Sequence, residues 1–423
     1  MKFTKYLLKD VANVDISGVD KKSKPGETQV RLCNFVDVYY NWAVTKSMTD
    51  NFMVATANNN QIEKFTIKKG QVAITKDSET RDDIGVSTYI ADDFDELVIL
   101  GYHNALITPD ESKLDGKYLN AYLHTKMAQN YFSYNASGSG QRYALSVDAI
   151  NDFQIYLPPI EEQRRVGNLL SDIDRKIALN KSINCDLEAM AKQLYDYWFV
   201  QFDFPNAEGK PYKSSGGKML WNDTLKREIP EGWNNAKLID IANITMGQSP
   251  EGSSYNEDGN GVLFYQGSTD FGMRFPSVRQ YTTAPSRYAK KGDILMSVRA
   301  PVGAVNIANN DCCIGRGLAA LNSKIGSITH LYYIINDLKA AFDQRNSAGT
   351  TFGSITKDDL YNLPVVKPSK EVIDKFEKIC KSMFDEQMVL GEEIDSLLSQ
   401  RDSLLPLLMN GQVSIKQPIN RNL

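Results

Sequence analysis

One stretch of the sequence combines arginines with aromatic residues in a pattern that suits contact with DNA. Between positions 271 and 288, Arg274, Arg279 and Arg287 alternate with aromatic residues, namely Phe271, Phe275, Tyr281 and Tyr288. A guanidinium can donate two parallel hydrogen bonds to a guanine edge or a phosphate, and aromatic rings can stack on bases or wedge between them. The three arginines are therefore predicted DNA contacts. Arginines beside aromatics also occur on ordinary β-rich surfaces, which is the alternative interpretation.

Two loops rich in glycine and hydroxyl residues form a second candidate set. Residues 137–143 end in Arg142 and Tyr143, and residues 347–353 contain Thr350 and Thr351. Small side chains with exposed backbone amides suit phosphate contact, so we expect these four residues to touch DNA. An ordinary tight connection between strands is the alternative. Cations elsewhere complete the set of predicted contacts: Lys68, Lys69, Lys76 and Arg299.

Motifs for catalysis and for metal or cofactor binding are missing from the sequence. There is no GxxxxGK[ST] or GxGxxG motif, and no proline pair of the kind that amino-methyltransferases use to hold a target base. The histidines have no cysteine or carboxylate at metal-ligand spacing. We therefore expect no catalytic residue, metal site or cofactor in this chain. The five cysteines show no CxxC spacing, which favours reduced thiols and a cytoplasmic location.

The charge balance limits how DNA could be bound. The chain has 423 residues with 48 basic and 52 acidic side chains. A domain that binds DNA through charge alone usually has a pI above about 9. DNA binding would therefore depend on local cationic patches or on a basic partner subunit. No apolar run approaches the roughly 20 residues of a membrane-spanning helix, so no membrane contact is expected.

An internal repeat determines the expected architecture. Short patterns recur in the same order, with an offset that falls from 230 to 210 residues. The paired segments are 8–13 with 238–243, 72–75 with 294–297, 101–118 with 315–332, and 145–150 with 355–360. A steadily shrinking offset is expected if the second copy has shorter surface loops. The sequence therefore predicts two similar domains, each made of short strands and a few helices.

Each copy continues into a segment with the heptad periodicity of a long helix. One heptad position carries Val166, Ile173, Asn180, Leu187 and Leu194 in the first copy, and Phe376, Met383, Leu390, Leu397 and Leu404 in the second. A sustained apolar heptad predicts a coiled-coil seam, in which Asn180 could fix the register of the helices. The expected boundaries are domains at 1–157 and 233–366, helices at 158–202 and 367–412, a linker at 203–232 and a tail at 413–423.

Two motifs in the second copy resemble a known family. Residues 292–303 and 312–321 closely resemble the target recognition domain of type I restriction-modification specificity subunits. Residues 157–163, which lead into the first helix, and Tyr197-Trp198-Phe199, which close it, resemble the same family. The equivalents in the first copy, 70–75 and 101–104, depart from the motif. In this family the two domains read different half-sites, which accounts for such divergence.

The resemblance implies an α+β fold with two target recognition domains, separated by two antiparallel helices that form a coiled coil. Each domain would read one half of a bipartite double-stranded DNA target. A helix of about 40 residues spans roughly 60 Å, enough to set the gap between the half-sites. The helices would dock two methyltransferase subunits that bind S-adenosylmethionine and methylate adenine N6. Restriction subunits using ATP and Mg²⁺ would join that complex.

Two other functions stay open on the sequence alone. A scaffold or decoy could bind methyltransferase subunits or DNA without reading sequence. A self-contained modification enzyme is the other alternative, and the missing cofactor and target-base motifs argue against it.

Overall fold

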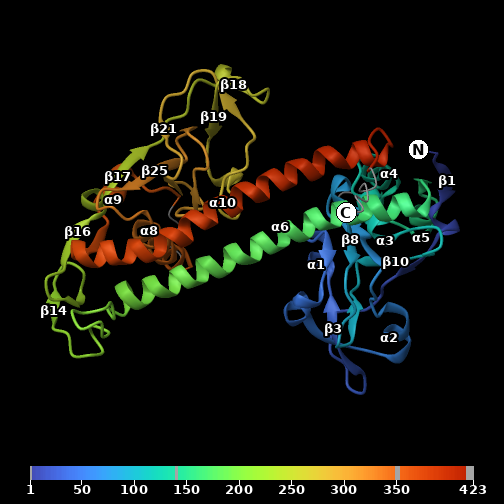
Figure 1. Cartoon of the computed structure of the whole chain (residues 1–423), viewed down its shortest axis with the longest axis horizontal. Helices are drawn as coiled ribbons and strands as arrows, with labels where there is room; N and C mark the ends of the chain where they lie inside the picture. The colour runs from blue at the N-terminus through green and yellow to red at the C-terminus, as the bar shows by residue number, and fades with distance from the viewer. Residues whose placement is uncertain (1, 139–141, 348–352, 416–423) are drawn as a thin grey trace, which may run out of the picture. The chain divides into compact units, whose positions relative to one another are not determined.

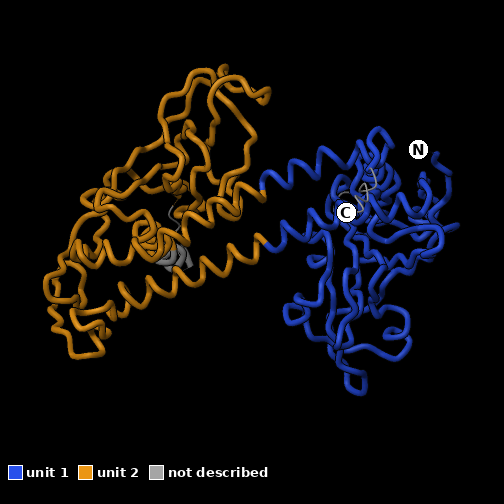
Figure 2. The backbone as a smooth tube through the Cα atoms, in the orientation of Figure 1, with its two compact units in different colours: residues 1–179, 395–423 blue, residues 180–394 orange. Residues whose placement is uncertain are grey.

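The computed structural model describes residues 2–138, 142–347 and 353–415. The chain divides into two compact units, Met1–Leu179 with Asp395–Leu423, and Asn180–Ile394 (Figure 2). Each unit contains one predicted domain together with one end of each of the two long helices (Figure 1).

Unit 1 is built on a five-stranded sheet in the order β2-β10-β6-β8-β4. Its strands are Ala12–Ile16, Asn104–Pro109, Val72–Thr75, Ser87–Ile90 and Ala43–Val44, in that order. Strand β6 is buried on both faces: Val72 and Ile74 enter one hydrophobic core, while Ala73 enters another. Alternate side chains of a strand point to opposite faces, so a continuous apolar run suits a strand covered on both sides.

Two helices pack on the central strands β6 and β8 of unit 1. Helix α3, Gly116–Leu123, is capped by the Asp115 carboxylate, which accepts a hydrogen bond from the Tyr118 amide at 2.9 Å. Helix α1, Phe35–Tyr39, also contacts β6 and β8. The remaining helices of this domain are η1 Leu8–Asp10, η2 Lys46–Asn51, α2 Asn59–Phe65, η3 Arg81–Asp83, α4 Lys126–Asn135 and α5 Val147–Asn151.

Smaller sheets complete unit 1. Strand β3, Thr28–Cys33, lies between antiparallel β5, Met53–Ala57, and parallel β9, Val98–Leu100. Strands β1, Thr4–Leu7, and β13, Gln154–Leu157, pair antiparallel. A third small sheet has the order β11-β12-β7, with strands Ser137–Gly138, Tyr143–Ala144 and Asp77–Ser78.

Unit 2 repeats this topology. Its main sheet has the order β17-β25-β22-β23, with strands Ala242–Met246, Leu318–Ser323, Ile294–Ser297 and Val305–Ile307. The second sheet again contains a parallel pair, β19, Val262–Tyr265, with β24, Cys312–Ile314. Strands β16, Asn234–Lys237, and β26, Pro364–Lys367, pair as β1 and β13 do. Each repeated sequence pattern lies on an equivalent strand or helix, so the prediction of two similar domains is confirmed.

The other elements of unit 2 lie around these sheets. They are α7 Leu238–Ile241, η5 Gly252–Ser254, β18 Tyr255–Asn256, η6 Ser268–Asp270, β20 Tyr281–Thr282, β21 Tyr288–Ala289, α8 Ile328–Ser347 and α9 Lys357–Tyr361. The segment 203–232, predicted as a linker from its composition, contains a β-hairpin of β14, Met219–Asn222, and β15, Arg227–Pro230. Phe204 and Ile229 from this segment, and Trp233 directly after it, enter the core of unit 2. The segment was predicted as a linker because most of its residues are polar and only a few are apolar.

The long helices are α6, Ile160–Tyr195, and α10, Lys370–Met409, and a short π-helical turn at Asp196–Val200 follows α6. In unit 2 the Asn180 amide donates to the Glu393 carboxylate at 2.7 Å, and Gln387 Nε2 donates to the Asn184 carbonyl at 3.3 Å. Partner numbers fall along α10 as they rise along α6. The two helices therefore pair antiparallel, as expected.

The ten predicted seam residues are buried or half-buried. Val166, Asn180, Phe376 and Leu390 are buried, and the other six are half-buried. A second heptad position of α6 is also buried, with Gln163, Leu170, Ile177, Asn184 and Ala191. The contact therefore includes a polar layer of Asn180, Asn184 and Gln387 in unit 2.

Among the residues that the structure describes, no helix is both long enough and apolar enough to cross a bilayer.

Candidate nucleic-acid interface

A polar cavity of about 230 Å³ in unit 2 gathers three arginines. Three segments form its walls: the loop that follows β19, the end of β22, and the turn between β24 and β25. Its lining side chains are Gln266, Ser268, Thr269, Asp270, Arg279, Ser297, Arg299, Ala300 and Arg316, with Gly267 and Gly317. The arginines Arg279, Arg299 and Arg316 all have exposed side chains. The cavity is therefore cationic and open to solvent.

A buried carboxylate fixes the orientation of Arg279. Its Nε lies 2.8 Å from Asp270 Oδ1, and its Nη2 lies 3.4 Å from Asp270 Oδ2. Asp270 is only 7% exposed, whereas the Arg279 side chain is 55% exposed. The hydrogen bond and charge of Asp270 raise the pKa of Arg279, so the guanidinium stays charged. The remaining N–H groups of Arg279 are free to face a ligand.

Arg299 and Arg316 have no ion-pair partner within the described ranges. Arg316 stands between Gly315 and Gly317 in the turn before β25. A Cβ at Gly317 would lie 2.6 Å from the Gln266 carbonyl oxygen, so this close approach of two backbones requires glycine. The Gly-Arg-Gly sequence thus holds one arginine at the cavity. Sequence reasoning missed Arg316, although its flanking glycines were a usable signal.

Unit 1 has a cavity of about 440 Å³ at the equivalent position. It lies beside helix α1, which follows β3, the end of β6, and the turn between β9 and β10. The residues that line it are different: Lys21, Phe35, Val36, Tyr39, Tyr40, Asp77, Ser78, Glu79, Thr80, Asp83, His103 and Arg142. The two domains therefore present different chemistry at the same place in the fold.

His103 is the centre of a charged cluster in the unit 1 cavity. Its Nδ1 lies 2.5 Å from Asp77 Oδ2, and its Nε2 lies 3.3 Å from Arg142 Nη2. Lys76 Nζ lies 2.9 Å from Asp77. Although burial opposes ionisation, hydrogen bonds from Lys76 and His103 lower the pKa of Asp77. Because Nδ1–H donates to Asp77, Nε2 can accept from Arg142, and the imidazole orients that exposed arginine.

The structure brings only some of the predicted contacts to these cavities. Arg142 lines the cavity of unit 1, and Arg279 and Arg299 line the cavity of unit 2. Lys76 is mostly buried in its ion pair with Asp77. Tyr143 is half-buried, with the Arg81 guanidinium 5.2 Å from its ring centroid.

The other predicted contacts lie elsewhere. Lys68 and Lys69 are exposed at the start of β6, whereas the cavity lies at the end of that strand. Arg287 is exposed outside the cavity lining. Thr350 and Thr351 lie outside the described residues.

Arg274 corrects the prediction made from its neighbours in sequence. It is 8% exposed, and its Nη1 lies 3.3 Å from Glu188 of α6. Its guanidinium carbon lies 4.8 Å from the ring centroid of Phe384 on α10. A guanidinium enclosed in this way has no surface to offer a base or phosphate. Arg274 therefore anchors its loop to the helix pair.

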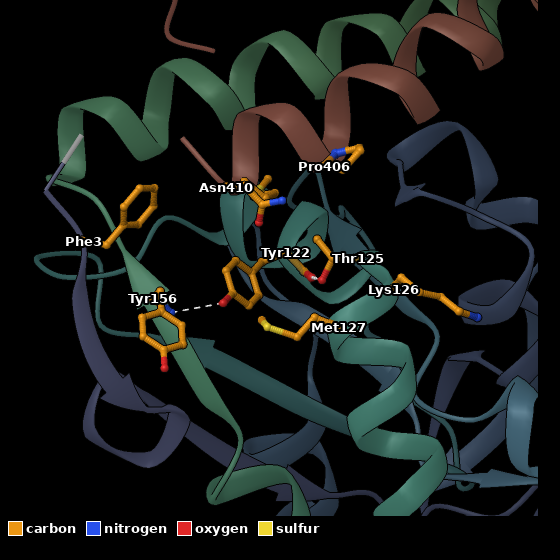
Figure 3. A pocket seen from close by; sticks show the side chains of 9 residues that line it. Phe3, Tyr122, Thr125, Lys126, Met127, Tyr156, Pro406 and Asn410 are labelled. Atoms are coloured by element: carbon orange, nitrogen blue, oxygen red, sulfur yellow. Dashed lines mark hydrogen bonds between the residues drawn. The ribbon is translucent and has the colours of Figure 1, made fainter. Parts of the chain in front are cut away.

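A third cavity, of about 350 Å³ in unit 1, has a different character (Figure 3). Figure 3 shows Phe3, Tyr122, Met127 and Tyr156 around it, with Pro406 from α10 above. The Tyr156 amide donates to the Tyr122 hydroxyl at 3.2 Å. Its mainly apolar lining is unsuited to reading base edges. In the described part of the chain, no group of three or more His, Cys, Asp or Glu side chains could hold a metal ion.

Comparison with known proteins gives a consistent result. Residues 2–189 and 230–385 match the family described as type I restriction modification DNA specificity domain. A Methanocaldococcus jannaschii protein that carries the name MjaX specificity subunit is 31% identical, over 76% of this chain and 73% of that protein. The Haemophilus influenzae type I restriction enzyme HindI specificity subunit is 24% identical, over 83% of this chain and 88% of that protein.

One solved structure shares the fold. The crystal structure of a type I restriction-modification system S subunit from M. genitalium is 16% identical to this chain and has a TM-score of 0.59. The match covers 99% of this chain and 97% of the other.

Proposed function

Because the chain belongs to the family of type I restriction-modification DNA specificity subunits, we propose that it selects a bipartite DNA sequence for such a system. Each domain reads one half of the target. The observation that carries this proposal is the pair of equivalent cavities, which lie at the same strand ends but have different linings. A duplicated fold with two different reading surfaces suits a target with two different halves.

The helix pair is proposed to set the gap between the half-sites and to dock two methyltransferase subunits. Unit 2 supports a docking role because its helices expose large apolar side chains. Met190 of α6 is 53% exposed, and Ile379 and Val389 of α10 are 43% and 59% exposed. Met190 and Ile379 both line an open hollow of about 880 Å³ on this part of the helix pair. Clustered exposed apolar side chains are typical of protein interaction surfaces.

The chemistry is assigned to the partner subunits. In this proposal the methyltransferases bind S-adenosylmethionine and methylate adenine N6, and the restriction subunits use ATP and Mg²⁺. The chain itself recognises sequence, binds no cofactor or metal, and acts in the cytoplasm. Partner subunits also supply part of the positive charge that a chain with a net charge of −4 lacks.

A selection experiment tests the proposal. The chain is purified with its methyltransferase subunits, captured on a library of randomised duplex DNA, and the bound sequences are read. We expect a split motif with a fixed gap. Binding without sequence preference would instead support the decoy alternative. Methyl transfer by this chain alone, without the partner subunits, would support the enzyme alternative.

A further inference from the structure

The loop between β19 and β20 in unit 2, residues 266–280, is held in one conformation at several points. The Ser277 amide donates to the Asp270 carbonyl at 2.7 Å. The buried Asn306 side chain accepts from the Gly272 amide at 3.2 Å and donates to the Gly272 carbonyl at 3.0 Å. These hydrogen bonds, one within the loop and two to Asn306, restrict its backbone. A loop restricted in this way can hold a side chain ready for binding.

Arg274 and Phe275 attach this loop to the two helices. Arg274 reaches Glu188 of α6 and Phe384 of α10, as described above. Phe275 packs so closely on Gly391 of α10 that a Cβ there would lie 2.1 Å from its ring. The inner side of the loop is therefore fixed to the helix pair. Asp270 and Arg279 lie on either side of this attachment in the sequence, and both line the cationic cavity.

The geometry of the Arg279–Asp270 pair leaves one side of the guanidinium free. A guanidinium has five N–H donors, and Asp270 accepts one from Nε and one from Nη2. One N–H of Nη2 and both of Nη1 remain. Two of these, one from each terminal nitrogen, point in parallel away from Asp270. A parallel pair of donors matches a partner with two adjacent acceptors.

We propose that Arg279 reads a guanine in the half-site of the second domain, with Asp270 as its positioning residue. This inference rests on the proposed function. In the major groove guanine presents two acceptors, O6 and N7, whereas adenine presents one acceptor and one donor. Two parallel donors therefore select guanine over adenine. Arg299 and Arg316 have no carboxylate to orient them among the described residues, and they contact the phosphates beside that base.

Among the described residues that line the cavity of unit 1, no arginine forms an ion pair with a carboxylate. In its cavity helix α1, which follows β3, carries Tyr39, whose hydroxyl donates to Asp83. That hydrogen bond raises the pKa of Tyr39 to about 12, so the hydroxyl stays protonated. A hydroxyl offers a single donor where Arg279 offers two. The effect of changing Arg279 is therefore confined to one half-site.

The test compares variants of the full chain, each assembled with its methyltransferase subunits and selected on randomised duplex DNA. Arg279→Lys keeps the charge but removes the fork, and Asp270→Asn removes the carboxylate that orients it. Arg227→Lys is the matched control, because Arg227 is an exposed arginine of unit 2 that lies on β15, outside the cavity. Thermal unfolding of each assembled complex checks that the variants fold.

We expect Arg279→Lys to lower the preference for guanine at one position by about 10- to 100-fold, while the rest of the motif is unchanged. Asp270→Asn should weaken the preference at the same position by a smaller factor, and Arg227→Lys should change nothing. An unchanged motif in Arg279→Lys, a relaxed position that is not a G·C pair, or loss of all binding in a folded complex would overturn the assignment. If the wild-type complex yields no split motif, the proposed function itself has failed.

Discussion

At the residue scale, burial separates arginines that the sequence cannot distinguish. Arg274 and Arg279 lie five positions apart in the same aromatic-rich stretch, yet one is enclosed by the helices and the other faces a cavity. Sequence spacing predicted DNA contacts for both, and the structure places Arg279 at the cationic cavity of unit 2. It could not predict that Arg274 turns inward, because Glu188 and Phe384 come from helices far away in the sequence. Side-chain direction depends on these long-range contacts.

Arg316 provides a prediction about phosphate contact. Replacing Arg316 with alanine removes one exposed cation from the cavity of unit 2. If it binds a phosphate, affinity should fall for every DNA sequence alike, because backbone contacts carry no base information. The slope of log K for DNA binding against log salt concentration is negative, and its magnitude should fall by about 1. Binding measured at several salt concentrations checks this, and an unchanged slope would contradict the phosphate role.

His330 provides a prediction about acid stability. It is 2% exposed beside the Phe199 ring, and burial lowers its pKa from 6.5 to about 3. As the pH falls below 6.5, the unfolded chain binds this proton first, so unfolding becomes more favourable. The free energy of unfolding falls by up to about 1.4 kcal/mol per pH unit until the pH reaches the pKa of His330 in the folded state.

His330→Phe should therefore make unfolding of unit 2 less sensitive to acid between pH 6.5 and 4. Chemical denaturation across this range measures the effect. His124→Phe is the comparison in unit 1, since burial lowers the pKa of His124 to about 4. The same pH dependence in His330→Phe and in the wild type would contradict the role of His330.

At the scale of elements, heptad periodicity predicted the two long helices because a seam repeats regularly along the chain. The internal repeat paired residues 72–75 with 294–297, and the structure places both segments on central strands, β6 and β22. The hairpin at 219–230 was missed because its few apolar residues have no period. The antiparallel pairing followed from family resemblance, since periodicity alone does not give helix direction.

The polar layer of the helix pair provides a prediction about stability. Asn184 is 3% exposed, and neither polar atom of its side-chain amide has a hydrogen-bond partner in the described part of the chain. Leucine has a similar branched shape and no polar atoms to leave unpaired. Asn184→Leu should therefore stabilise the protein by about 1–2 kcal/mol.

Asn180→Leu is the matched control, because it loses the hydrogen bond to Glu393. It should gain less stability than Asn184→Leu in thermal or urea unfolding. If Asn184→Leu destabilises the protein and is no more stable than Asn180→Leu, the prediction is wrong. The Asn184 side chain would then be hydrogen-bonded in the folded protein.

At the scale of the whole molecule, duplication explains both what could and what could not be read from the sequence. Shared patterns revealed the two domains because core positions must keep their spacing. The reading surfaces diverge, so the His103 cluster of one domain does not resemble the Arg279–Asp270 pair of the other. The residues proposed to distinguish the half-sites are therefore ones that a repeat search cannot align.

The most direct test of the account lengthens both helices together. Residues 173–179 are duplicated after Leu179 and residues 388–394 after Ile394, at the boundary between the two units. Seven residues add about 10 Å of helix, or roughly three base pairs. Duplicating only 173–179 serves as the unmatched control, and it should alter or abolish the spacing.

Selection on randomised duplex DNA by the complex with both insertions then measures the gap. We predict that the two half-site sequences stay the same while the gap lengthens by about three base pairs. A motif with the wild-type gap would contradict the claim that the helix pair sets the distance between two readers.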